Sequence, residues 1–156
     1  MKKIAAVIMA AMIMATAMAG CGGSGGTAEN VDLTAVVTEI DNKYPNEMQS
    51  IDTVDDLNKY YGIKAEDVKS FAAEYSKSAI DEVVLVEAVN ADAAKRVADC
   101  LQNRYNSKKQ QGASYSAEDL QIVDKCSVKT NGSFVSMIVS ANASDMESIY
   151  TAALNG

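Results

Sequence analysis

The chain has 156 residues, a length that suits one ordinary domain with a short additional segment. Its 21 acidic residues outnumber its 14 basic ones, and the net charge of −7 at neutral pH disfavours binding to nucleic acid or to an anionic lipid surface. The absence of histidine excludes Ser-His-Asp and Cys-His catalytic groups and imidazole metal ligands.

The first 21 residues have the pattern of a lipoprotein signal. Two lysines are followed by an uncharged apolar stretch over residues 4–17 and then by the run Met18-Ala19-Gly20-Cys21. A basic start, a short apolar segment and small residues before the cut site are typical of a signal peptide, and the apolar stretch is too short for a comfortable membrane span. We therefore expect a signal peptide over residues 1–20 and a diacylglycerol on the Cys21 thiol.

This lipid, with palmitate as a typical acyl chain, would anchor the protein on the extracytoplasmic face of the cell membrane. An ordinary secretory signal and an uncleaved anchor are the alternatives, and both would still export the protein. Residues 21–30 are rich in glycine and are predicted to form a flexible tether. Residues 31–156 are then left as a single domain.

Two helices are expected at the start of this domain. Asp32 is a suitable cap for a helix whose apolar residues recur at helical spacing up to Tyr44, and Pro45 ends it. A second, short helix is predicted between the capping residue Thr53 and Gly62, which suits a left-handed helix end.

The middle of the domain contains the clearest strand. Residues 64–78 are interpreted as a turn followed by an edge strand, with continued helix as the alternative. The run 82–89 is short, rich in β-branched residues and apolar on both faces, so we expect it to be a central strand. Asn90 then caps a long helix predicted over residues 91–111.

The last part of the domain combines a hairpin with a final helix. Ser116 is predicted to open a brief helical turn. Strands at 126–130 and 133–139 flank Asn131-Gly132, the two-residue sequence best suited to a type I′ turn. A capping box at Ser144 then predicts a C-terminal helix.

Together these elements predict an α+β domain. N-terminal helices come first, followed by a three- or four-stranded antiparallel sheet. The long helix and the C-terminal helix are expected to pack on one face of the sheet, which would leave the other face or an edge uncovered.

Several of these features resemble a domain-of-unknown-function family of small lipoproteins from Gram-positive anaerobes. The similarity covers roughly residues 33–154 and rests on the lipobox ending at Cys21, the helix end Tyr60-Tyr61-Gly62-Ile63, Glu82 opening an apolar strand, Tyr115, and the Asn131-Gly132 turn. The resemblance implies the location and the fold. It carries no activity and no catalytic residues to transfer.

Clustered acidic residues are the remaining candidates for chemistry, either as an acid and base pair or as calcium ligands. They occur in four groups: Asp52 with Asp55 and Asp56, Glu66-Asp67, Glu118-Asp119, and Asp145 with Glu147. Each group lies at a predicted helix start, where negative charge stabilises the exposed amides by about 0.3–1 kcal/mol. None matches a calcium loop. We therefore predict no catalytic residue, no metal site and no cofactor.

Two cysteines remain once Cys21 is lipidated. Cys100 lies at the edge of the buried stripe of the long helix, and Cys126 is expected to point inward from its strand. A disulfide between them is one interpretation, and two buried free thiols are the other.

The leading functional hypothesis is a non-enzymatic, membrane-tethered module that binds another envelope protein or a small ligand. The alternatives are an enzyme that acts on envelope polymers through paired carboxylates, and a structural or assembly factor. The arrangement of acids distinguishes the first two. A cleft with two carboxylates, one with a strongly raised pKa, would favour catalysis, and a flat surface with scattered charges would favour interaction.

Overall fold

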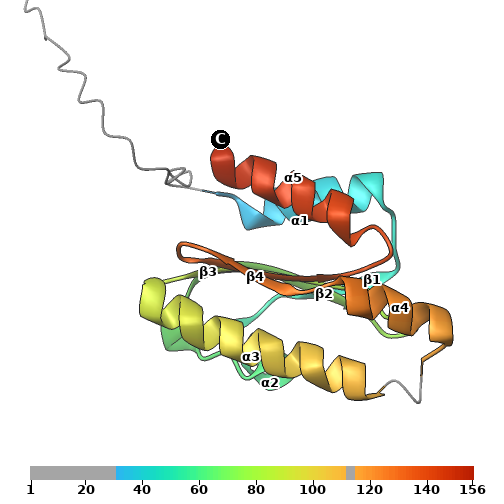
Figure 1. Cartoon of the computed structure of the whole chain (residues 1–156). Helices are drawn as coiled ribbons and strands as arrows, with labels where there is room; N and C mark the ends of the chain where they lie inside the picture. Colours follow the sequence, from blue (N-terminus) through green and yellow to red (C-terminus); the bar gives the residue numbers. More distant parts are fainter. Residues whose placement is uncertain (1–30, 112–114) are drawn as a thin grey trace, which may run out of the picture.

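The structure, a computed structural model, describes residues 31–111 and 115–156 as three layers (Figure 1). A five-stranded antiparallel sheet lies between two layers of helices, so the predicted α+β class is confirmed. The predicted signal peptide, the lipidation site Cys21 and the tether lie outside the described residues. No helix within these residues is long and apolar enough to span a membrane.

The sheet has one strand more than the largest number predicted. Its order is β1 (Met48–Ile51), β2 (Val68–Ser76), β3 (Glu82–Ala88), β5 (Phe134–Val139) and β4 (Val128–Asn131). The central position predicted for β3 is confirmed. The strand predicted as an edge, β2, is instead the second strand, because the unpredicted β1 pairs with part of it.

The helices cover both faces of the sheet, which corrects the prediction that the long and C-terminal helices share one face. α1 (Leu33–Lys43) and α5 (Ala143–Asn155) lie on one face, and α2 (Val54–Tyr61), α3 (Ala91–Gln110) and α4 (Ala117–Lys125) lie on the other (Figure 1). The physical reason lies in β3 and β5, whose residues are all buried. Strands that are apolar on both faces need a covering layer on each side.

Local capping signals explain most helix ends. Asp32, Thr53, Asn90 and Ser116 each accept backbone hydrogen bonds at the start of a helix. Ser116 forms a capping box, but the helix that it starts, α4, has nine residues and is longer than the brief turn predicted. Gly62 ends α2 with a φ of 74°, a left-handed conformation that glycine adopts without strain. The capping box predicted at Ser144 is wrong: α5 begins at Ala143, two residues earlier than a cap at Ser144 implies, and no side chain caps it.

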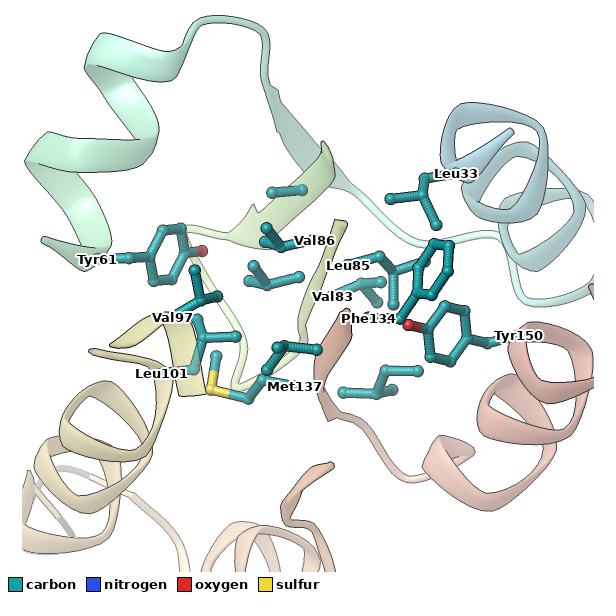
Figure 2. Packing of buried hydrophobic residues seen from close by; sticks show 14 of the residues in the cluster. Leu33, Tyr61, Val83, Leu85, Val86, Val97, Leu101, Phe134, Met137 and Tyr150 are labelled. Atoms are coloured by element: carbon teal, nitrogen blue, oxygen red, sulfur yellow. The ribbon is translucent and has the colours of Figure 1, made fainter. Parts of the chain in front are cut away.

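The sheet divides the hydrophobic core into two halves (Figure 2). The half beneath α1 and α5 includes Leu33, Val83, Leu85, Phe134 and Tyr150. The half against α2 and α3 includes Tyr61, Val86, Val97, Leu101 and Met137. Neighbouring residues of β3 alternate between the two halves, as side chains on a strand must. Burial on both sides thereby stabilises this strand at the centre of the fold.

Candidate functional site

A pocket of about 310 Å³ lies between α1 and the β1–β2 edge of the sheet. We call it the acidic pocket. Its walls come from α1 and from the two outer strands, and it is lined by Thr34, Val37, Thr38, Asp41, Ser50, Ile51, Asp52, Phe71, Ala72, Ala73 and Glu74. Three of these residues are acidic, and none is basic.

The periodicity of the two elements brings Asp41 and Glu74 together. Thr34, Thr38 and Asp41 follow one another at helical spacing, so they line one side of α1 beside its buried stripe. Glu74 lies on the face of β2 that α1 covers, and Ser50 stands opposite it in the register with β1. The pocket is therefore formed by the pairing of β1 with β2 beneath a helix.

Glu74 has an unusual electrostatic environment. Glu74 is only 4% exposed. Asp41 and Glu74 line the same pocket. Burial is the largest cause that raises the pKa of Glu74 to about 8, and the nearby Asp41 carboxylate is the second. Glu74 therefore keeps its proton at neutral pH.

Apart from the proton that Glu74 itself carries, one oxygen of each carboxyl group also lacks a donor. Within the described part of the chain, Oδ1 of Asp41 and Oε1 of Glu74 are buried and have no hydrogen-bond partner. A buried acceptor without a donor is costly, typically about 1–3 kcal/mol. A ligand that brings N–H donors and positive charge would satisfy both oxygens and neutralise the pair.

The pocket is a poor metal site by its donor set. Among residues 31–111 and 115–156, no group of three or more potential metal-ligating side chains is found. Calcium prefers six to eight oxygen ligands. The two carboxylates and the neighbouring hydroxyls therefore fit an organic cation, which needs fewer acceptors, better than a metal ion.

A second charged cluster lies on the opposite face of the sheet and is fully paired. Glu82 is completely buried, and it accepts hydrogen bonds from Arg104 at 2.9 and 3.2 Å and contacts the Lys108 Nζ at 2.8 Å. Burial opposes ionisation of Glu82, but the two cations outweigh it and hold its pKa below the usual range. Lys108 also donates to the carbonyl of Ile80 at 2.9 Å. This cluster stabilises the packing of α3 on β3.

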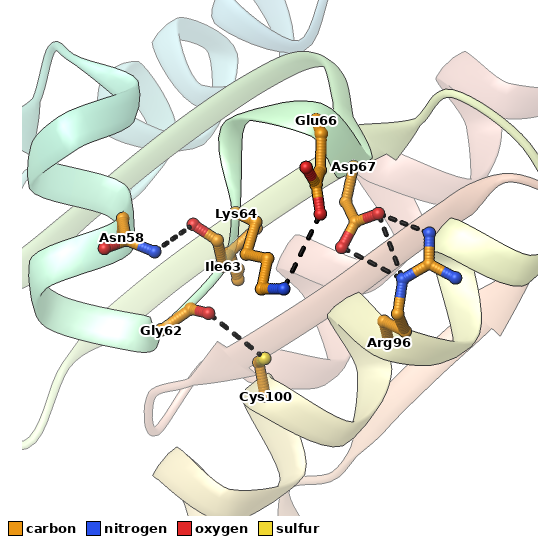
Figure 3. A network of polar contacts seen from close by, with 8 residues as sticks. All are labelled: Asn58, Gly62, Ile63, Lys64, Glu66, Asp67, Arg96 and Cys100. Carbon is orange, nitrogen blue, oxygen red and sulfur yellow. Dashed lines mark hydrogen bonds and ion pairs between the residues drawn. The ribbon is translucent and has the colours of Figure 1, made fainter.

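A third network joins α2, the short helix η1 (Ala65–Asp67) and α3 (Figure 3). The Arg96 Nε donates to both carboxylate oxygens of Asp67, at 3.1 and 3.2 Å. This contact lowers the pKa of Asp67. Asn58 donates to the carbonyl of Ile63 at 3.0 Å. Asp67 was predicted to act as a helix-end charge, and the structure makes it the buried partner of Arg96.

The matched family covers most of this domain. A model described as "Domain of unknown function (DUF4358)" matches residues 41–140. The chain belongs to the DUF4358 family. No curated protein and no solved structure matches the chain.

The DUF4358 match begins at Asp41 and includes Glu74, so both carboxyl groups of the pair lie within it. It also includes all five strands, and it excludes most of α1 and all of α5. The part of the acidic pocket contributed by the sheet therefore belongs to the family's domain.

The two cysteines of the DUF4358 domain are free. The Cys100 thiol lies 3.5 Å from the carbonyl of Gly62, as Figure 3 shows, and the Cys126 thiol lies 3.2 Å from the carbonyl of Ile122. The structure thus contains separate thiols rather than the bridge that one interpretation of the sequence favoured. Cys126 is buried and Cys100 is partly exposed.

The predicted acidic clusters have different outcomes in the DUF4358 domain. Asp55 and Asp56 lie in the first turn of α2, and Glu118 and Asp119 lie in the first turn of α4, as predicted. Asp52 precedes α2 and lines the acidic pocket.

Sequence reasoning did not identify Asp41 and Glu74 as site residues. The usable signals were an acid beside the apolar stripe of a helix and a lone glutamate within a strand, and neither is specific by itself.

Proposed function

We propose that this protein is a lipid-anchored, extracytoplasmic module of the cell envelope that binds a cationic organic ligand in its acidic pocket without chemical turnover. The observation that carries this proposal is the Asp41–Glu74 pair, whose buried oxygens lack donors in a pocket with no basic lining residue. The ligand class is an ammonium or guanidinium group on a short apolar stem.

The pocket's lining supports this ligand class. The carboxylates provide strong acceptors for charged N–H groups, and the hydroxyls of Thr34, Thr38 and Ser50 can accept additional hydrogen bonds. Val37 and Ala72 provide apolar surface for the stem. A ligand pocket commonly combines such apolar surface with a few convergent polar groups.

The lipid anchor is proposed from the sequence of residues 1–21. The basic start, the apolar stretch and the run Met18-Ala19-Gly20-Cys21 support cleavage before Cys21 and lipidation of its thiol. The test is labelling of expressing bacterial cells with radioactive palmitate. Wild type should incorporate label and Cys21→Ala should not, and equal label in both would overturn the proposed anchor.

A second candidate function is an enzyme that acts on envelope polymers through the same carboxyl pair. The raised pKa of Glu74 beside a second acid favours it, because such a pair can donate and accept a proton near neutral pH. The geometry favours it less. The described lining provides no basic side chain to stabilise a developing negative charge.

Binding of n-butylammonium to the full chain tests the proposed function. Amide NMR shifts should change around the acidic pocket and saturate with a dissociation constant on the order of millimolar, as expected for a ligand of this size. Neutral n-butanol should not bind. Glu74→Gln and Asp41→Asn should each weaken binding, whereas Glu39→Gln, which alters an exposed acid of the same helix, should not.

Equal binding of n-butylammonium and n-butanol would contradict a site for cations. Equal affinity in wild type and in Glu74→Gln would place the binding elsewhere. If purified envelope polymer is cleaved by wild type but not by Glu74→Gln, the enzyme candidate replaces the binding module.

A further inference from the structure

The outer edge of β2 is only half covered by β1. β1 pairs with residues 73–76, whereas β3 pairs with β2 along nearly its whole length. Residues 68–72 of β2 therefore have a strand on one side only, within the part of the chain that the structure describes. An uncovered strand edge presents backbone groups that can pair with another extended chain.

Every second residue of β2 directs its backbone N–H and C=O groups to this uncovered edge. The Ser76 N–H donates to the carbonyl of Asp81 at 2.9 Å, so the backbone groups of Ser76 face the β3 side. Successive residues of a strand alternate between its two sides. The N–H and C=O of Phe71 consequently face outward, beyond the end of β1.

The uncovered edge is continuous with the acidic pocket. Phe71 and Ala72 line the pocket, and Ala72 lies on the same face of β2 as Glu74, two residues away. A residue placed opposite Ala72 on an added strand would project its side chain onto this face. Diagonal neighbours on one face have Cβ atoms about 7–8 Å apart, which a long side chain can span.

We infer that the partner of this protein is an extended peptide segment that adds to the edge of β2 beside Phe71 and inserts a lysine or arginine side chain into the acidic pocket. This inference rests on the proposed function, and it specifies that the cationic group of the ligand is a side chain of a peptide segment. Backbone pairing would provide affinity for any extended chain, and the acidic pair would select a basic side chain. Charge complementarity therefore identifies the occupant as a basic segment of another protein.

A second copy of this chain is a less suitable occupant. The corresponding segment of another copy offers Lys69, whose Nζ is already bound to Glu87 at 2.6 Å. The register of β2 is also irregular between Val68 and Ser70, and a bulge or a lysine on an edge discourages pairing between identical edges. The site is better suited to a foreign segment.

The test uses a capped pentapeptide, Thr-Val-Lys-Val-Thr, and the full chain. The peptide should bind more tightly than n-butylammonium and should shift the amide signals of Ser70, Phe71 and Ala72. Replacing its lysine by norleucine should weaken binding about tenfold, since charge-assisted hydrogen bonds are lost. Glu74→Gln should have a similar effect, and Glu118→Gln, a change at an exposed acid, should have none.

N-methylation of the peptide distinguishes strand addition from simple cation binding. Only one edge of the peptide faces β2, and alternate amides of the peptide point to that edge. Methylating these amides should abolish the gain in affinity over n-butylammonium, whereas methylating the amides of the other edge should preserve it. If both methylated peptides bind as well as the parent, strand addition is wrong while the cation site stands. If n-butylammonium and all peptides fail to bind, the proposed function fails together with this inference.

Discussion

Replacement of Glu74 by glutamine should remove a pH-dependent loss of stability. In the folded protein the pKa of Glu74 is about 8, against an ordinary value of 4.5. Between these values the folded state holds a proton that the unfolded state releases, so stability falls as pH rises through this window and is constant above it. Each pH unit corresponds to at most about 1.4 kcal/mol.

At pH 7 this relation sets an upper limit of about 3 kcal/mol on the lost stability. Because the protein interior responds to a buried charge with an effective dielectric constant of about 20, far above that of a dry medium, we expect about 1–2 kcal/mol. Glu74→Gln should therefore match wild type near pH 5 and exceed it by this amount at pH 8. Histidine, Asp67 and Glu82 do not interfere with the measurement in this pH window, because the chain has no histidine and the pKa values of Asp67 and Glu82 lie below their usual range.

Urea denaturation followed by circular dichroism at pH 5, 6, 7 and 8 measures this difference. The exposed Glu39→Gln variant, which alters an acid of α1 beyond its first turn, is the matched control and should follow wild type at every pH. If wild type and Glu74→Gln show the same dependence on pH, the reasoning about the buried pair is refuted.

Three further outcomes follow from the packing. Lys108→Met should destabilise the fold by about 3 kcal/mol in urea denaturation, because the buried Glu82 loses one of its two cations. Gly62→Ala should cost about 1 kcal/mol in the same assay; a Cβ there would meet no atom within 4 Å, so the cost reflects the positive φ alone. Iodoacetamide without reductant should modify Cys100 in the native protein and Cys126 only after unfolding, as detected by peptide mass spectrometry.

The controls for these outcomes are specific. Lys95→Met, at an exposed ion pair with Asp92, should leave stability nearly unchanged, and an effect as large as that of Lys108→Met would argue against the burial of Glu82 as the cause. Equal stability of wild type and Gly62→Ala would argue against a left-handed helix end. Failure to alkylate either cysteine in denaturant would indicate the disulfide.

The local elements could be predicted because their signals are local. Asp32, Thr53 and Asn90 have side chains that satisfy helix amides. The hairpin between β4 and β5 was also predicted, but its two-residue turn lies one residue later than expected, at Gly132-Ser133, because Asn131 still pairs with Phe134 and only Gly132 has a positive φ. β1 could not be predicted in the same way. Its four residues form a strand only because β2 pairs with them, and that pairing joins segments far apart in the chain.

The sequence contained enough information to predict that helices cover both faces of the sheet. The apolar residues on both faces of β3 already required a helix layer on each side, and the expectation of an uncovered face did not follow from them. The acidic pocket could not be predicted from the sequence. Asp41 belongs to a helix and Glu74 to a strand, and only their packing, together with the position of β1, makes them a pair.

The most direct test of the central claim is an NMR titration of the Glu74 carboxyl carbon in the full chain, with and without n-butylammonium. The signal is assigned by its absence in Glu74→Gln. Without the ligand the midpoint should lie near pH 8, and a saturating amount of the ligand should lower it by about one unit or more, because the cation favours the ionised form of Glu74. A midpoint near 4.5 without the ligand, or no change on adding it, would contradict the proposal that the Asp41–Glu74 pair binds a cation.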